Sequence, residues 1–74
     1  MARGKSSVTV KFGKRLGALR KERDWTFVYL SEVSGISVSS LHALEHGSQR
    51  PTIDTLDIIA KSFDMTMSEL LKGF

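Results

Sequence analysis

The stretch from residue 26 to residue 47, TFVYLSEVSGISVSSLHALEHG, most strongly constrains how this chain can fold. Two short helical patterns flank Gly35, a residue that adopts the backbone conformation of a tight turn at little steric cost. The expected inward positions are Leu30 and Val33 in the first helix, and Leu41 and Leu44 in the second. A helix, a glycine-containing turn and a second helix form one packed unit, and this unit sets the expected fold of the whole chain.

Helical patterns also account for the rest of the chain, and no alternating strand pattern or internal repeat is present. One helix is expected over about residues 8–23, and another follows a Thr52 cap and ends near residue 63. A last short helix follows the capping box that Thr66 and Glu69 can form. The expected inward residues of the first two are Phe12, Leu16, Leu19, Ile53, Leu56, Ile59, Ala60 and Phe63. Five helices in 74 residues predict a compact all-α bundle with a single core.

The net charge of +3 is distributed unevenly along the chain. Residues 1–24 carry eight basic and two acidic side chains, a net +6, whereas residues 25–74 carry three basic and six acidic ones, a net −3. Residues 1–7 include Arg3 and Lys5 and lack apolar periodicity, so we expect them to form a flexible basic arm. This asymmetry favours a polyanionic partner, although a solvated helix face with a loose basic tail would produce the same count.

Several functional classes find little support in the sequence. Cysteine is absent, so disulfides and thiolate chemistry are excluded, and no apolar run approaches the roughly 20 residues of a membrane span. The segment from His42 to His46 spells the zinc-protease motif H-x-x-E-H, in which Glu45 would be the base. A catalytic zinc needs a third protein ligand and a substrate cleft, for which so short a chain leaves little room. We therefore expect no metal, no cofactor and no enzymatic activity.

A set of short motifs recurs in order along residues 11–72. The motifs are Phe12-Gly-Lys-Arg-Leu16, Leu19-Arg20-Lys21, Leu30, Ser34-Gly35-Ile36-Ser37, Leu41, Leu44-Glu45, Gly47, Pro51-Thr52, Asp54-Thr55-Leu56, Ile59-Ala60 and Ser68-Glu69-Leu70-Leu71. With this spacing they resemble the Cro/C1-type (XRE) helix-turn-helix family, which has the lambda-repressor-like fold. The resemblance implies a domain over residues 8–74, with the helix-turn-helix at its second and third helices. It also implies a cytoplasmic bacterial or phage regulator, acting as a repressor, that binds double-stranded operator DNA as a homodimer.

The resemblance further assigns roles to individual positions. The base-facing residues of the third helix would be Ser37, Val38, Ser39, Ser40, His42 and Ala43. The phosphate and arm contacts would be Arg3, Lys5, Phe27, Tyr29, Ser48, Gln49 and Arg50. A structural salt bridge would join Arg20 to Glu45, and a dimer interface would form from Met67, Leu70, Leu71 and Phe74.

The sequence departs from the family pattern at two places. The residue that opens the second helix is usually a glutamine that touches phosphate, but here it is Phe27, followed by Val28 and Tyr29. Either Phe27 is buried and Tyr29 contacts phosphate, or the three residues form an apolar patch for a protein partner, as in an antitoxin or anti-regulator. Residues 37–46 also contain no Arg, Lys, Gln or Asn, the side chains that discriminate bases most strongly. We therefore expect weak direct readout. A third interpretation is that the chain is the DNA-binding domain of a longer regulator.

Overall fold

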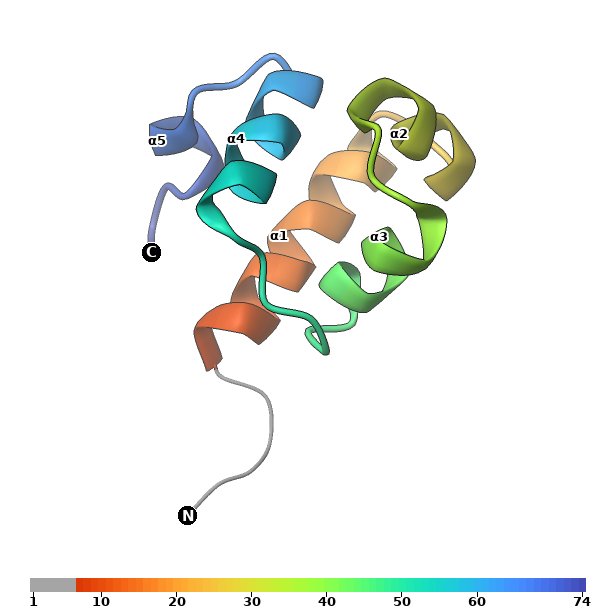
Figure 1. Ribbon diagram of the computed structural model, residues 1–74. Coiled ribbons are helices and arrows are strands. Elements are labelled where there is room, and N and C mark those ends of the chain that lie inside the picture. The colour runs from red at the N-terminus through yellow and green to blue at the C-terminus, as the bar shows by residue number, and fades with distance from the viewer. Residues whose placement is uncertain (1–6) are drawn as a thin grey trace.

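The computed structural model describes residues 7–74. This part of the chain folds into five α-helices joined by short connections (Figure 1). The helices are α1 (Ser7–Glu22), α2 (Phe27–Ser34), α3 (Val38–Glu45), α4 (Ile53–Ser62) and α5 (Met67–Leu70). The prediction of an all-α, five-helix domain is confirmed. Ser7 is the first residue of α1 rather than the last of the arm, and Arg3 and Lys5 lie outside the described residues.

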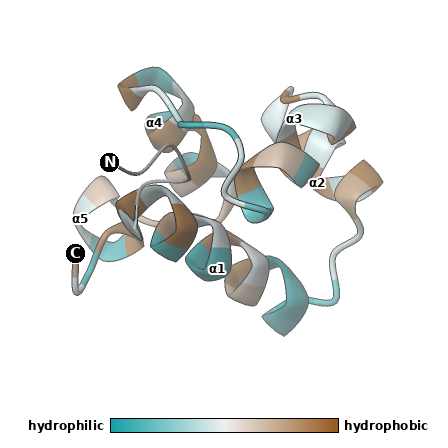
Figure 2. Ribbon diagram, turned by 90° about the horizontal axis from the view of Figure 1, so that it is seen from below, coloured by the Kyte–Doolittle hydropathy of each residue, from teal (hydrophilic) through white to brown (hydrophobic). Residues whose placement is uncertain are grey.

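α1 is the long central helix of the domain. In Figure 1, α4 and α5 lie to the left of α1 and α2 and α3 lie to its right, and in the view from below in Figure 2 both α3 and α4 lie above α1. The hydropathy colouring shows apolar residues alternating with polar ones along α1, as expected for a helix with one buried face (Figure 2). This arrangement leaves α2 and α3 together at one end of the molecule.

Four of the helices begin at a hydroxyl side chain that accepts a backbone N–H from the first turn. Thr26 accepts from Tyr29 N, and Ser37 and Thr52 accept from the equivalent amides of α3 and α4. At α5 the predicted capping box is complete, because Thr66 also donates its backbone N–H to Glu69 Oε1 at 2.8 Å. Each such cap satisfies a backbone donor that would otherwise be unpaired, and stabilises the helix by about 1 kcal/mol.

Two aspartates in left-handed conformation end α1 and α4. Asp24 has φ 56° and Asp64 has φ 58°. Each is followed by a residue whose N–H reaches back five positions, Trp25 N to Arg20 O at 3.1 Å and Met65 N to Ala60 O at 2.8 Å. These bonds satisfy carbonyls at the helix C-terminus, in the arrangement usually occupied by glycine.

The hydrophobic core joins all five helices. Its buried residues are Phe12, Leu16, Leu19, Leu30, Leu41, Leu44, Ile59, Ala60, Phe63 and Leu70. Two residues predicted to face inward are exposed, so those predictions were wrong: Val33 is 44% exposed and Ile53 is 76% exposed. Val33 lies on the outer face of α2, in which Leu30 is the one fully buried residue, and Ile53 is the first residue of α4, ahead of its buried turn.

Gly13 permits a close crossing between α1 and α3. A Cβ atom at this position would lie 2.5 Å from Leu44 O and 2.6 Å from Glu45 O, far inside van der Waals contact. The last turn of α3 therefore rests directly on the backbone of α1. Because Leu41 and Leu44 are also fully buried, one face of α3 is fixed by the core and the opposite face is left to solvent.

Candidate nucleic-acid interface

The turn between α2 and α3 is closed by its own hydrogen bonds. Gly35 adopts φ 78° and donates its N–H to Ser31 O at 2.8 Å. Ile36 N donates to Ser34 Oγ at 3.1 Å, and its side chain packs against the core. Ser37 then caps α3 by accepting from Ser40 N at 3.2 Å. The turn thus sets the direction of α3 relative to α2 without help from any partner.

The structure brings the predicted base-facing residues together on the outward side of α3. Ser37, Ser39 and His42 are exposed, and Val38, Ser40 and Ala43 are half-buried. Ser37 Oγ lies 3.4 Å from Ser39 Oγ, so the two hydroxyls can share a hydrogen bond. The surface that could enter a DNA groove is therefore small, neutral and rich in hydroxyl groups.

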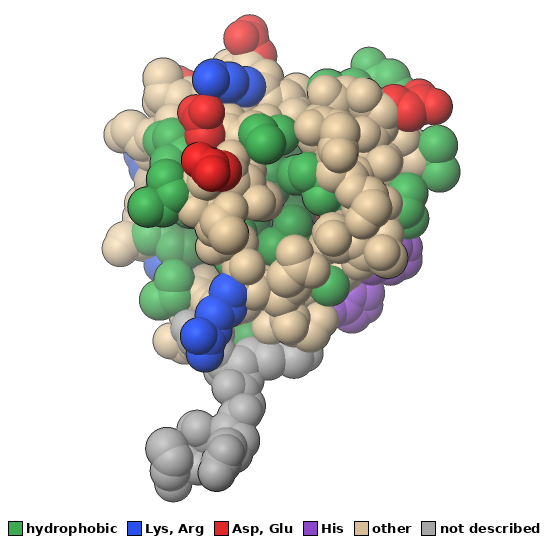
Figure 3. Space-filling view, viewed as in Figure 1, with side chains coloured by type: hydrophobic (Ala, Val, Ile, Leu, Met, Phe, Trp, Pro, Cys, Tyr) green, Lys and Arg blue, Asp and Glu red, His purple; other side chains and the backbone are tan. Residues whose placement is uncertain are grey.

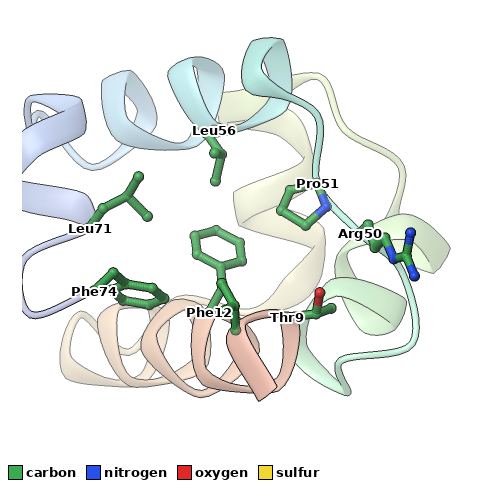
Figure 4. A pocket seen from close by; sticks show the side chains of 8 residues that line it. Thr9, Phe12, Arg50, Pro51, Leu56, Leu71 and Phe74 are labelled. Carbon is green, nitrogen blue, oxygen red and sulfur yellow. The ribbon is translucent and has the colours of Figure 1, made fainter. Parts of the chain in front are cut away.

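The loop after α3 carries an exposed cation, Arg50. Ser48, Gln49 and Arg50 are all exposed, but the Ser48 hydroxyl already donates to Ala43 O at 3.2 Å, and its backbone N–H bonds the same oxygen. Ser48 therefore closes the C-terminus of α3. The Arg50 guanidinium points outward, away from a nearby apolar pocket (Figure 4), and is placed to meet an anion.

The predicted salt bridge between Arg20 and Glu45 is present and largely buried. Arg20 Nε donates to Glu45 Oε2 at 2.6 Å and Nη2 donates to Oε1 at 3.2 Å. The remaining guanidinium nitrogen, Nη1, donates to Trp25 O at 2.8 Å. One arginine thereby ties α1, the loop after it and the C-terminal turn of α3 together, and bidentate geometry makes such a pair rigid.

Phe27, at the start of α2, is half-buried because its ring packs against neighbouring side chains. The ring centroid lies 3.9 Å from that of His42, with 21° between the planes, and 4.0 Å from Cζ of Arg20. A phenyl ring has no hydrogen-bond donor, so any phosphate contact at this position is limited to the backbone N–H. Tyr29 is 46% exposed and packs its ring edge-on against Trp25 at 5.0 Å.

His42 and His46 occupy the outer edge of α3, where Figure 3 shows the two histidines side by side. Their rings are nearly parallel, with centroids 6.1 Å apart, and His46 Nδ1 lies 2.7 Å from His42 O. Among residues 7–74, no group of three or more His, Cys, Asp or Glu side chains is placed to hold a metal ion.

Much of the positive charge of α1 is used within the domain. Arg15 donates to the carbonyls of Leu70 and Glu69 at 3.1 and 2.9 Å, and Lys11 donates to Gly73 O at 2.7 Å. These contacts neutralise the C-terminal end of α5. The charge count alone therefore overstates the cations that α1 offers to a polyanion.

In the described part of the chain, no helix is long and apolar enough to cross a membrane.

The C-terminal residues divide between core and surface. Leu70 is 0% exposed, so it has no surface for a second chain, and its assignment to a dimer interface was wrong. Met67 and Leu71 are half-buried and Phe74 is exposed. Leu71 and Phe74 line one side of an apolar pocket of about 430 Å³ whose other walls include Phe12 and Pro51 (Figure 4).

The domain is similar to known regulators over most of its length. A helix-turn-helix family model matches residues 16–70. The HTH-type transcriptional regulator AnsR of Bacillus subtilis is 39% identical over 57 residues, which cover 77% of this chain and 49% of that protein. The chain thus spans about half the length of the curated relatives it matches.

Two solved structures share the fold closely. The restriction-modification controller protein C.AhdI of Aeromonas hydrophila has a TM-score of 0.84 and 27% identity, over 89% of this chain and 100% of that one. SinR, a master regulator of biofilm formation solved in complex with DNA, has a TM-score of 0.75 and 29% identity, over 82% of this chain and 98% of that one. Since the family model covers most of the chain, the protein belongs to the HTH_3 helix-turn-helix family, the Cro/C1 (XRE) type that its sequence motifs resemble.

Proposed function

We propose that this domain regulates transcription by binding operator DNA with α3 in the major groove, and that it acts as a repressor in a bacterial or phage-infected cytoplasm. The observation that carries the proposal is the outward face of α3, whose opposite face is held in the core by Leu41 and Leu44, together with the exposed Arg50 in the loop that follows. The similarity to SinR, which was solved with DNA, supports the same conclusion. The role is binding, with no cofactor and no chemical step.

Recognition on this face would depend on small contacts. Val38 and Ala43 can offer apolar contact to thymine methyl groups, and Ser39 can donate or accept a hydrogen bond with several bases. None of these side chains makes the bidentate contacts that discriminate bases by about 1–3 kcal/mol each. Most of the affinity would come from phosphate contacts such as that of Arg50, so it should fall steeply with salt.

The active form would be a homodimer on a two-fold-related site. The candidates for the contact between the two protomers are Met67, Leu71 and Phe74, because these residues have accessible surface whereas Leu70 is buried. The apolar pocket beside Leu71 and Phe74 adds surface of the same character. A two-fold dimer would place two α3 helices about one DNA turn apart, roughly 34 Å.

Selection of bound sequences from random DNA tests the proposal. A palindromic motif with half-sites about one helical turn apart is expected. Arg50→Ala should weaken binding to all sequences and lower the salt slope by about 1, whereas Ser39→Ala should alter the preferred bases. Lys61→Ala, which removes one charge from the distant end of α4, is the matched control. Unchanged binding in both the Arg50 and Ser39 variants would refute the recognition model.

A protein partner is the second candidate, because α2 exposes apolar surface. Val28 is 59% exposed, and Tyr29 and Val33 are 46% and 44% exposed. Phe27 is not part of this surface, since its ring packs against His42 and Arg20. If an antagonist binds here, Val28→Ser with Tyr29→Ala should abolish its binding and spare affinity for DNA. If this double variant still bound the antagonist, a protein-binding role for α2 would be refuted.

A further inference from the structure

Phe27 makes contacts that the usual glutamine at the start of the second helix could not make. Its ring lies 3.9 Å from the imidazole of His42 on α3 and 4.0 Å from the guanidinium carbon of Arg20 on α1. Parallel stacking of this kind restrains both partners through dispersion and the quadrupole of the ring. Phe27 therefore links Arg20, inside the domain, to His42, on its candidate DNA surface.

The inner end of this stack is fixed. All three guanidinium nitrogens of Arg20 donate hydrogen bonds, to the two carboxylate oxygens of Glu45 and to the carbonyl of Trp25. Arg20 and Glu45 are both largely buried, so Arg20 cannot move without breaking several bonds at once. The Phe27 ring packs against this immobile group, and the His42 ring packs against Phe27 in turn.

The outer end of the stack lies at the surface, where the exposed rings of His42 and His46 are nearly parallel with centroids 6.1 Å apart. His42 is exposed and lies on the edge of α3 that faces the first residue of α2. An α-helix that lies in a major groove turns its central residues to the bases and its edges to the sugar-phosphate strands. An imidazole N–H at this edge can donate to a phosphate oxygen, and it adds a positive charge when it is protonated.

We propose that His42 donates to a DNA phosphate and that Phe27 is its positioning residue, which holds the imidazole in place by stacking against it. The inference rests on the proposed DNA-binding function. A side chain that is already held loses little rotamer freedom on binding. Since immobilising a free side chain weakens binding by roughly 2- to 12-fold, removal of the stack should weaken affinity by that factor.

The test combines DNA affinity with a signal that does not depend on DNA. The probe is a fluorescein-labelled mixture of random-sequence duplexes of roughly three helical turns, because affinity for such a mixture reports backbone contacts. The variants are Phe27→Leu, Phe27→Tyr, His42→Ala and the double variant Phe27→Leu/His42→Ala. Val28→Ala, an exposed apolar change on the same helix, is the control. Ring-current shifts of the His42 ring protons are recorded for each variant without DNA.

The proposal predicts a specific combination of results. Phe27→Leu and His42→Ala each weaken binding, the double variant is no weaker than His42→Ala, and Phe27→Tyr and Val28→Ala bind like the wild type. The His42 ring protons lose their upfield shift in Phe27→Leu and keep it in Phe27→Tyr. These results would distinguish positioning from a general loss of stability, which would act without regard to His42.

Three outcomes would overturn the inference. Independent, multiplying effects of Phe27→Leu and His42→Ala would show that Phe27 does not act through His42. Wild-type affinity in both single variants would refute the phosphate contact and leave the DNA-binding function standing. Absence of binding by the wild-type domain would overturn the proposed function, and this inference with it.

Discussion

Replacing Gly13 with alanine should destabilise the domain, although alanine is the better helix former. The new Cβ would lie 2.5 Å from Leu44 O and 2.6 Å from Glu45 O. Both are backbone atoms in the last turn of α3, so neither can rotate away as a side chain could. Relief requires α1 and α3 to separate by roughly 1 Å, which would loosen the interdigitated core around Leu44.

Two opposing terms set the size of the effect. Alanine in place of glycine in a helix interior contributes about 1 kcal/mol of stability. Overpacking a tight contact costs about 1–3 kcal/mol, and a clash with two backbone atoms belongs at the upper end of that range. The net expected loss is about 2 kcal/mol, equivalent to a fall of roughly 8–16 °C in Tm for a domain of this size.

Two control variants on the same helix separate these terms. Gly17→Ala places its Cβ 3.1 Å from Glu45 Oε1, an overlap that a shift of a few tenths of an ångström relieves, so its stability should stay within about 1 kcal/mol of the wild type. Ala18 is exposed, and Ala18→Gly should cost about 1 kcal/mol from helix propensity alone. Urea denaturation followed by far-UV circular dichroism measures all three. A Gly13→Ala domain as stable as the wild type would refute the argument for a close α1–α3 crossing.

Two further changes test local features of the fold. Asp24→Gly and Asp64→Gly should each stabilise the domain by about 0.5–1 kcal/mol in thermal unfolding, because glycine adopts positive φ without the steric cost that aspartate bears; a loss of stability would show that the carboxylates have a role of their own. Arg20→Met should cost about 3 kcal/mol in urea denaturation, because it leaves the largely buried Glu45 carboxylate without its partner. The double variant Arg20→Met/Glu45→Leu should recover much of that loss, and failure to recover it would locate the defect elsewhere.

The helices and their caps could be predicted because they depend on local chemistry. Threonine caps and apolar spacing are legible in the sequence, and the core residues they predicted, such as Leu30 and Leu41, are buried. Periodicity in a helix of eight residues does not resolve which neighbouring position faces inward, and for that reason Val33 was misplaced. Leu70 was misassigned for a related reason, since an apolar residue near a terminus gives no sign of whether a core or a partner covers it.

The contacts of the candidate site were less predictable. The pair formed by Arg20 and Glu45 came from the family resemblance, whereas the stack of Phe27 on His42 joins residues far apart in sequence and has no motif. A departure from the family at Phe27 was the one available signal. The hydrogen bonds from Lys11 and Arg15 to carbonyls near the C-terminus were likewise not predictable from the sequence, because a charge count does not show where each cation lies.

Amide chemical-shift mapping during titration with duplex DNA tests the central claim most directly. If α3 enters the groove, the largest changes should fall in residues 37–43 and in the loop from Gly47 to Arg50, with smaller ones at the start of α2. The C-terminal half of α4, around the exposed Lys61, should change little, and changes at α5 would report dimer formation rather than a DNA contact. Changes centred on the C-terminal half of α4, or spread evenly over the domain, would contradict DNA recognition through α3.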